Sequence, residues 1–358
     1  MSKKEIISFP HLGSYSTPIS YLLKKLTPHE VMIPPKTTKK TLELGSKYSP
    51  DTVCIPFKYN LGNFIEALDN GATIILQAGG GCRYGNYAEV QEKILKDLGY
   101  DFKFYSLVDV DRFKVGYVYK IFKEINPKLR FLKFAKYGLI TILMVMMMDN
   151  LDKIIRKNIG FEKIKGTFKQ TRENMLNELS NTKGFIHLFM IYLKYRKKFK
   201  RIEIVKDENR LKIGIIGELY TAMEPFATFF LEEELAKNNI EIKRFTNATY
   251  LLFTKALVAK KYLRKVKKYC HYKIGADGMD NVYRSLYLIE NNYDGIIHTK
   301  PFGCSPEITA IPIIDKVCKE YNMPIIYFSF DSETSEVGVK TRLEAFYDML
   351  QAKKGDKL

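Results

Sequence analysis

Short apolar segments alternate with amphipathic helical patterns in two separate stretches of the chain, and this alternation constrains the fold more than any other feature. In the stretch that ends near Val110, "ATIILQAG" is followed by "YAEVQEKILKDLG". After Leu211, "LKIGIIGEL", "YDGIIHTKPFGC" and "MPIIYFSFD" are each followed by a helical pattern. Such alternation is typical of parallel sheets covered by helices on both faces. The sequence therefore predicts an α/β fold: two Rossmann-like parallel-sheet domains with a helical insertion between them.

The predicted organisation has three regions. We expect residues 1–110 to form an N-terminal α/β domain, residues 111–209 a basic helical region, and residues 210–358 a C-terminal α/β domain. A chain of 358 residues is long enough for separate domains with their own cores. The longest apolar run, Gly138 to Met148, has roughly half of the ~20 residues that a membrane span needs. We therefore expect a buried core helix there, and no membrane partner.

The net charge of +18 is concentrated in the predicted helical region. Between Arg112 and Lys212 the chain carries 25 lysines and arginines but nine acidic residues. Such a surface attracts polyanions, which include nucleic acids, acidic proteins and nucleotide-like carriers such as coenzyme A. A solvated, lysine-rich set of helices explains the same composition without a ligand, and we weigh it as the simpler interpretation.

The cysteine content indicates metal or redox chemistry. Five cysteines occur, and no two have the C-x-x-C spacing. The N-terminal segment "MSKKEIISFPHLG" lacks the apolar stretch of a signal peptide, so we expect a cytoplasmic protein. An odd number of cysteines in such a protein argues against a disulfide framework. The missing C-x-x-C pairs argue against zinc-ribbon and thioredoxin-type sites.

Three of the cysteines lie where an apolar segment precedes a helical pattern. Cys54 ends the expected strand "TVCIP", Cys82 follows the strand "ATIILQA", and Cys304 follows "YDGIIHTKPFG". The helix after Cys304 has Ser305 as its expected N-cap and Pro306 at its first position. Because ligands bind beyond the carboxyl ends of parallel strands, we expect the three thiols to converge there. Three thiolates suit an iron–sulfur cluster whose fourth iron keeps an exchangeable ligand; the alternative is that each cysteine is a small buried residue at a tight turn.

Glycines and one arginine flank these cysteines. Gly80, Gly81 and Gly303 leave backbone N–H groups free to approach the sulfides of a cluster. Arg83 is a candidate to offset the charge of an anionic cluster or to bind a thioester's phosphate, and an ordinary salt bridge is an equal alternative.

Other polar residues follow the same expected strands. Glu218 ends the strand in "LKIGIIGEL" and is a candidate proton donor, or else a helix cap. Lys58 and Lys300 are near Cys54 and Cys304 in sequence. They are candidates to offset the charge of an anionic cluster, and the alternative is that they are ordinary solvated lysines. We expect His298 to be a half-buried residue with a hydrogen-bond partner rather than a ligand.

The remaining cysteines and glycines do not predict a site. Cys318 is expected in the core, and Cys270 at the surface or half-buried. The glycine triplet lacks the G-x-G-x-x-G spacing, which argues against NAD binding, and the absence of a P-loop motif argues against ATP hydrolysis by this chain.

Six segments together resemble the 2-hydroxyacyl-CoA dehydratase family, in the manner of the 2-hydroxyglutaryl-CoA dehydratase D-component. They are "FPHLGSY", "SPDTVCIPFKYNLGNFIEAL", "GGGCRYGNYAEVQEKIL", "IGIIGELYTAMEPF", "DGIIHTKPFGCSPE" and "FSFDSETSEVGVKTRLEAF". The chain is similar to the stand-alone branch labelled acyl-CoA dehydratase activase-related. The resemblance covers both α/β regions and is weakest in the basic helical middle.

The resemblance implies a cofactor and a partner. It implies an oxygen-sensitive [4Fe–4S] cluster held by Cys54, Cys82 and Cys304, and a separate ATP-hydrolysing activator that delivers single electrons at low potential. In dehydratases of the family the electron passes to a 2-hydroxyacyl-CoA thioester, and the resulting ketyl radical eliminates water. The motifs of the stand-alone branch imply no particular substrate.

The leading hypothesis is therefore an iron–sulfur redox protein that works with an ATP-dependent activator on an acyl-CoA-type or other small substrate. A non-catalytic [4Fe–4S] electron-transfer adaptor is the first alternative. A nucleic-acid-binding protein that uses the basic helices is the second and is less favoured. A dimer, with a cluster shared between chains, stays open.

Overall fold

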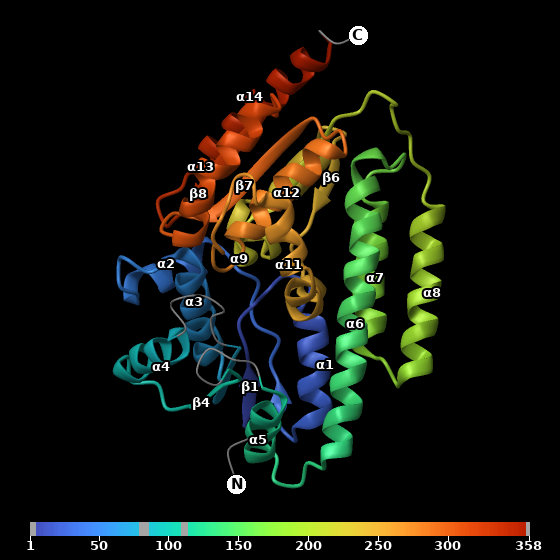
Figure 1. Ribbon diagram of the computed structural model, residues 1–358. Helices are drawn as coiled ribbons and strands as arrows, with labels where there is room; N and C mark the ends of the chain where they lie inside the picture. Colours follow the sequence, from blue (N-terminus) through green and yellow to red (C-terminus); the bar gives the residue numbers. More distant parts are fainter. Residues whose placement is uncertain (1–4, 79–85, 109–113, 356–358) are drawn as a thin grey trace. The chain divides into compact units, whose positions relative to one another are not determined.

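The computed structural model describes residues 5–78, 86–108 and 114–355 (Figure 1). The chain divides into two compact units, residues 1–145 with 175–191 and residues 146–174 with 192–358. Each unit contains one four-stranded sheet in which all neighbouring strands are parallel. The predicted α/β fold with two parallel-sheet domains is confirmed.

The first unit has the strand order β2-β1-β3-β4. Its strands are β1 (Ile6–Ser8), β2 (Glu30–Val31), β3 (Ile74–Gln77) and β4 (Lys103–Ser106). Its helices are α1 (Ser16–Leu26), α2 (Lys39–Tyr48), α3 (Ile55–Asp69), α4 (Tyr87–Asp97) and α5 (Val115–Ile125).

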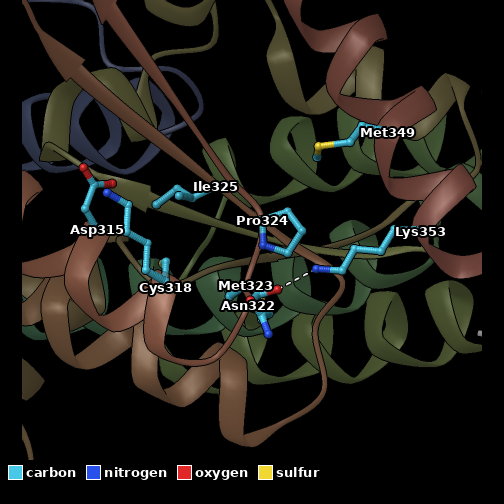
Figure 2. A pocket seen from close by; sticks show the side chains of 9 residues that line it. Asp315, Cys318, Asn322, Met323, Pro324, Ile325, Met349 and Lys353 are labelled. Carbon is cyan, nitrogen blue, oxygen red and sulfur yellow. Dashed lines mark hydrogen bonds between the residues drawn. The ribbon is translucent and has the colours of Figure 1, made fainter.

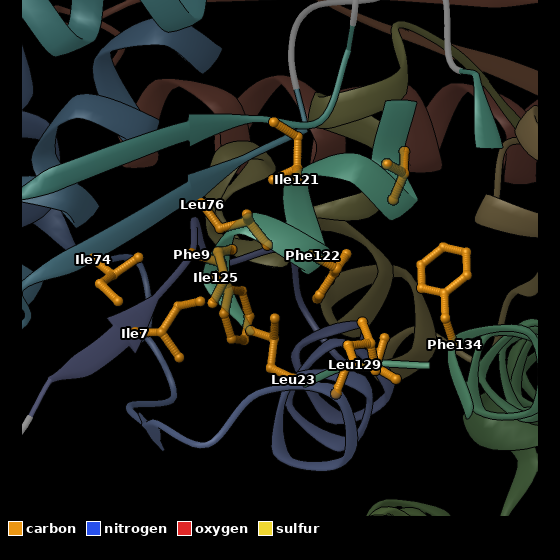
Figure 3. Close-up of a cluster of buried hydrophobic side chains, with 12 residues drawn as sticks. Ile7, Phe9, Leu23, Ile74, Leu76, Ile121, Phe122, Ile125, Leu129 and Phe134 are labelled. Carbon is orange, nitrogen blue, oxygen red and sulfur yellow. The ribbon is translucent and has the colours of Figure 1, made fainter. Parts of the chain in front are cut away.

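Helices cover both faces of this sheet because the side chains of a strand alternate between faces. Ile74 and Leu76 of β3 belong to a buried cluster that also contains Leu23 of α1 and Phe122 of α5 (Figure 3). Ile75, between them, belongs to the opposite cluster, formed with residues of α3 and α4. A strand that is buried on both faces reads as a continuous apolar run, as "ATIIL" does.

The second unit repeats this arrangement with the strand order β6-β5-β7-β8. Its strands are β5 (Lys212–Gly217), β6 (Glu241–Arg244), β7 (Gly295–Pro301) and β8 (Ile325–Phe330). Its helices are α9 (Leu219–Met223), α10 (Leu231–Lys237), α11 (Lys255–Val266), α12 (Gly278–Glu290), α13 (Ser305–Glu320) and α14 (Glu336–Gly355). A 3-10 turn at Pro225–Thr228 and a π-helical turn at Tyr250–Thr254 complete it.

Three helices follow one another between the sheets in sequence: α6 (Phe131–Asn158), α7 (Thr167–Ser180) and α8 (Phe185–Arg201), with a 3-10 turn at Ile159–Phe161. They lie within residues 111–209, and the two compact units divide them; a separate domain with these bounds stays a prediction. The apolar run from Gly138 to Met148 lies in α6, as expected, but only one of its faces is buried. Leu139 is 49% exposed and Met146 is 41% exposed. Residues 131–161 are long and apolar enough to cross a bilayer by length and composition.

One predicted strand is wrong. The segment "TVCIP" forms a turn between α2 and α3, and its last residues begin α3. Pro56 in the first turn of α3 has a backbone that suits a helix start, and this local preference prevails over the short apolar run. Cys54 therefore precedes a helix but does not end a strand.

Candidate functional site

The candidate site lies at the carboxyl end of the second sheet. In the order β6-β5-β7-β8 the strand order reverses between β5 and β7. Ligands of open α/β sheets bind at such a switch point, beyond the carboxyl ends of the strands. Glu218 directly follows β5, and Cys304 follows β7 after a short turn. The fold thus places two of the predicted residues at the ends of adjacent, hydrogen-bonded strands.

A close backbone approach positions Glu218. Gly217 has a φ of +136°, and a Cβ at this residue would lie 1.9 Å from the carbonyl oxygen of Thr299. The Glu218 N–H donates to that same oxygen at 2.9 Å. Only glycine fits this position, because other residues rarely adopt its φ and their Cβ would clash with β7.

Glu218 is the N-cap of α9. Its carboxylate accepts hydrogen bonds from the backbone N–H groups of Tyr220 at 2.9 Å and Thr221 at 3.0 Å. Burial raises the pKa of the Glu218 carboxyl from 4.5 to about 7. The two hydrogen bonds act to lower this pKa, and the carboxylates of Asp277 and Glu307 act to raise it. The capping role that we considered from sequence is present, and the raised pKa suits proton transfer near neutral pH.

Cys304 caps α13. The sequence predicted Ser305 as the N-cap, but the helix begins at Ser305 and Cys304 itself occupies the capping position. This thiol is half-buried at the positive end of the helix dipole, which favours the thiolate. A Cβ added at Gly303 would meet no atom within 4 Å among the described residues, so its backbone is accessible.

Lys300 lies beneath this turn. It is 5% exposed, and its ammonium donates to the carbonyl oxygen of Phe302 at 3.0 Å. Burial lowers the pKa of Lys300, while Cys304 and Glu307 act in the opposite direction. Lys300 is thus a buried cation that stabilises negative charge at Cys304, rather than a solvated lysine.

A buried network holds the first turn of α13. Glu307 is 1% exposed, and its carboxylate lies 2.7 Å from His298 Nε2 on β7. The Asn281 side-chain amide on α12 donates to both Glu307 oxygens, at 3.0 and 2.9 Å. His298 is fully buried, so the sequence prediction of a hydrogen-bonded histidine is right and its expected half-exposure is wrong. Through this network, β7 and α12 together fix the turn that carries Cys304.

The network continues along α12 to a buried arginine. Arg284 is 0% exposed and donates from Nη1 to Asn281 Oδ1 and Thr246 Oγ1, both at 2.9 Å. Its guanidinium lies over the ring of Tyr250, whose hydroxyl donates to Asp280 at 2.8 Å. None of these residues was among those predicted from the sequence. Asp277, Asp280, Asn281 and Arg284 have the i, i+3, i+4, i+7 spacing of one helix face, which is the signal that could have identified them.

In the first unit, Cys54 caps α3 and is half-buried. Its thiol is hydrogen-bonded to the hydroxyl of Tyr87, the first residue of α4. The ring of Tyr87 packs edge-on against Phe57 at 5.0 Å. Cys54 thus lies beside the start of α4, which follows the segment that carries Cys82 in the sequence.

Neutral side chains support this end of the first sheet. Gln77, the last residue of β3, donates to Gln91 of α4 at 2.9 Å. Gln91 donates in turn to the carbonyl oxygen of Phe57, in the first turn of α3, at 3.2 Å. Both glutamine side chains are buried.

Four predicted site residues, Gly80, Gly81, Cys82 and Arg83, lie outside the described residues. Cys54 belongs to the first unit and Cys304 to the second. Among the residues that the structure describes, no group of three or more histidine, cysteine, aspartate or glutamate side chains is arranged to hold a metal ion. The three-cysteine ligand set stays a prediction.

The other two cysteines belong to the core of the second unit. Cys318 is 2% exposed, as predicted, and burial raises the pKa of its thiol to about 12. Cys270 is 5% exposed, so its predicted surface or half-buried position is wrong; its thiol donates to the carbonyl oxygen of Tyr272 at 2.8 Å. Neither thiol is suited to bind a metal without rearrangement.

A surface pocket lies away from this site. It is formed where α13 ends and β8 begins, at the edge of the sheet opposite to Cys304 (Figure 2). Its lining residues are Asp315, Cys318, Lys319, Asn322, Met323, Pro324, Ile325, Met349 and Lys353. The amino ends of parallel strands are not where ligands of this architecture bind, so we assign the site to the other edge.

Comparison with protein families gives a match within the second unit. Residues 216–350 match the family described as 2-hydroxyglutaryl-CoA dehydratase, D-component. The matched segment contains Glu218, the His298–Glu307 pair and Cys304. A search of curated proteins found no match to this chain.

Proposed function

We propose that this chain, which carries a domain of the 2-hydroxyacyl-CoA dehydratase family in residues 216–350, is an iron–sulfur redox protein. In this proposal it receives low-potential electrons from a separate ATP-dependent activator and reduces or dehydrates an acyl-CoA-type or other small substrate in the cytoplasm. The observation that carries the proposal is the position of Cys304. Cys304 occupies the N-cap position of α13 at the switch point of the matched domain, and Glu218 follows the neighbouring strand.

The described thiols have the chemistry that a [4Fe–4S] cluster needs. Cys54 and Cys304 are half-buried helix caps, where thiolates are stabilised, whereas Cys318 is a buried thiol with a raised pKa. We propose Cys54, Cys82 and Cys304 as ligands of a cluster that supplies single-electron transfer at low potential. Cys82 follows β3 in sequence, as Cys304 follows β7, and these two strands occupy equivalent places in their sheets.

Glu218 is the residue that we propose for proton transfer. With a pKa of about 7, its carboxyl is present in both protonation states near neutral pH. A group of this kind can accept a proton from a substrate and return it to a leaving hydroxyl. Lys300 and the positive end of α13 stabilise negative charge at the same edge.

The cluster assignment is tested by iron content. The protein is purified without oxygen, and iron, sulfide and the electron paramagnetic resonance spectrum of the reduced form are measured. We expect Cys82→Ala to lose most of the iron and Cys318→Ala, the matched control, to keep it. Equal loss in both variants, or a wild-type protein without iron after anaerobic reconstitution, would contradict the assignment.

A second experiment separates a dehydratase from an electron-transfer adaptor. The iron-loaded protein is incubated with an activator ATPase, a reductant, ATP and a panel of 2-hydroxyacyl-CoA thioesters. Formation of the unsaturated thioester supports catalysis, and a Glu218→Gln variant should lower its rate while it keeps the iron. ATP-dependent reduction of the protein without product supports the adaptor instead.

A further inference from the structure

Helix α8 buries one side and exposes large apolar side chains on the other. The buried side chains, at most 3% exposed, are those of Leu188, Ile191, Tyr195 and Phe199. The exposed apolar side chains, between 45% and 79% exposed, are those of Ile186, Phe189, Met190 and Leu193. Since an α-helix has about 3.6 residues per turn, the second set falls on the side opposite to the first. The helix therefore has a second apolar stripe, which faces outward.

The neighbouring helix in the sequence shows that such a stripe is not a general property of this region. Helix α7 also buries one side, with Phe168, Met175 and Leu179. Its exposed residues are polar and include Lys169 and Glu173. Single exposed apolar residues need no explanation, but a stripe along two turns of one helix marks an interaction surface.

The charges of α8 are all of one sign. Its six charged residues, all exposed, are Lys194, Arg196, Lys197, Lys198, Lys200 and Arg201. Lys197 and Arg201 continue the outward face beyond Leu193 by helical spacing. The outer face thus has an apolar half followed along the helix by a cationic half, and apolar burial and cationic charge are the two contributions that bind helices to an anionic membrane surface.

Helix α6 carries a similar face. Leu132, Leu139 and Met146 recur at intervals of seven residues and are 81%, 49% and 41% exposed. The two acidic residues of α6, Asp149 and Asp152, are buried, so its exposed charges are all lysines. Only 28% of the 18-residue apolar stretch that makes this helix long and apolar enough to cross a bilayer is buried. Helices α6 and α8 therefore each have an apolar face that is exposed among the described residues. Each helix also exposes cations, and neither exposes a carboxylate.

Charge decides between the candidate occupants of the α8 face. A second copy of this chain would bring cations against cations, since α8 has no acidic residue to pair with them. A nucleic acid would pair with the lysines and arginines but would leave the apolar stripe in water. A bilayer that contains anionic phospholipids satisfies both halves, because acyl chains cover the apolar side chains and phosphates neutralise the cations.

We propose that the outer face of α8 docks on the surface of an anionic phospholipid bilayer, with the apolar stripe inserted between headgroups and the basic end in contact with phosphates. This peripheral contact replaces the sequence expectation of no membrane partner. It is independent of the proposed cluster chemistry, since none of its residues belongs to the candidate site.

Vesicle sedimentation tests the proposal with the full-length protein. The probes are phosphatidylcholine vesicles and phosphatidylcholine vesicles that contain phosphatidylglycerol. We expect binding to the anionic vesicles only, weakened by salt. The double variant Phe189→Ser/Met190→Ser and the double variant Lys197→Glu/Arg201→Glu should each bind at least about tenfold more weakly. Circular dichroism verifies that each variant is folded.

Matched controls come from exposed residues of α13 and α14, outside the α8 face. Val337→Ser on α14 removes a side chain that is 73% exposed, and Lys319→Glu on α13 reverses an exposed charge; both should bind like the wild type. Equal binding to neutral vesicles, no binding to anionic vesicles, or unchanged binding by both α8 variants would overturn the proposal. A concentration-dependent dimer that the Phe189→Ser/Met190→Ser variant abolishes, or nucleic-acid binding without vesicle binding, would also overturn it and identify the other occupant.

Discussion

The two α/β domains share a strand order but hold their cysteine-capped helices differently. In the first unit, the amide groups of Gln77 and Gln91 connect the end of β3 to the first turn of α3. In the second unit, titratable groups connect β7 to the first turn of α13, through His298 and Glu307, with Asn281 as a third partner. The same topology is thus supported by a neutral network in one domain and an ionisable network in the other.

The two domains surround their cysteines with different kinds of side chain. The first domain offers the Cys54 thiol a tyrosine hydroxyl as hydrogen-bond partner. The second domain adds Glu218 and Lys300 at the same edge as its cysteine, and their pKa values are shifted by burial. Perturbed titratable groups cluster where proton chemistry takes place. We therefore expect the domain that matches the dehydratase family to carry the proton transfer.

The largest expected effect comes from breaking the ionisable network. Glu307→Leu leaves His298 and Asn281 buried without their shared acceptor, and we expect a loss of about 3–5 kcal/mol in the free energy of unfolding. Urea unfolding of the cluster-free protein measures it. Glu307→Gln keeps an acceptor and should lose less. If both variants unfold like the wild type, the network does not hold the α13 turn.

A smaller, pH-dependent effect is expected at Glu218. Its folded pKa of about 7 lies above the ordinary 4.5, so the folded protein favours the protonated carboxyl. The stability that this provides is complete below about pH 4.5 and is lost as the pH rises through 7. Glu218→Gln should therefore gain stability relative to the wild type between pH 4.5 and 7, by no more than about 3 kcal/mol. A difference that does not change with pH would show that the carboxyl is not perturbed.

The smallest effect is expected in the neutral network. Gln91→Leu removes the acceptor of the Gln77 Nε2 group and the side-chain hydrogen bond to the Phe57 carbonyl. We expect a loss of about 1–2 kcal/mol that does not vary between pH 5 and 8. Urea unfolding at both pH values measures it. A loss equal to that of Glu307→Leu, or one that depends on pH, would remove the distinction between the two networks.

Local patterns were sufficient for the fold class and for part of the site. The alternation of apolar segments and amphipathic helices predicted both parallel sheets, because strand and helix periods depend on neighbouring residues only. The same reasoning placed Glu218 and Cys304 at strand ends. It failed for "TVCIP", where a helix start competed with a short apolar run, and it placed the N-cap one residue late, at Ser305 instead of Cys304.

The sequence by itself determined the alternation of strands and helices apart from the segment "TVCIP", the family resemblance, and the concentration of basic residues between Arg112 and Lys212. Only the tertiary structure decided that His298 pairs with Glu307, that burial raises the pKa of Glu218, and that one apolar face of α8 is exposed among the described residues. The physical reason is that burial and hydrogen-bond partners depend on residues distant in the chain, which a local pattern does not specify.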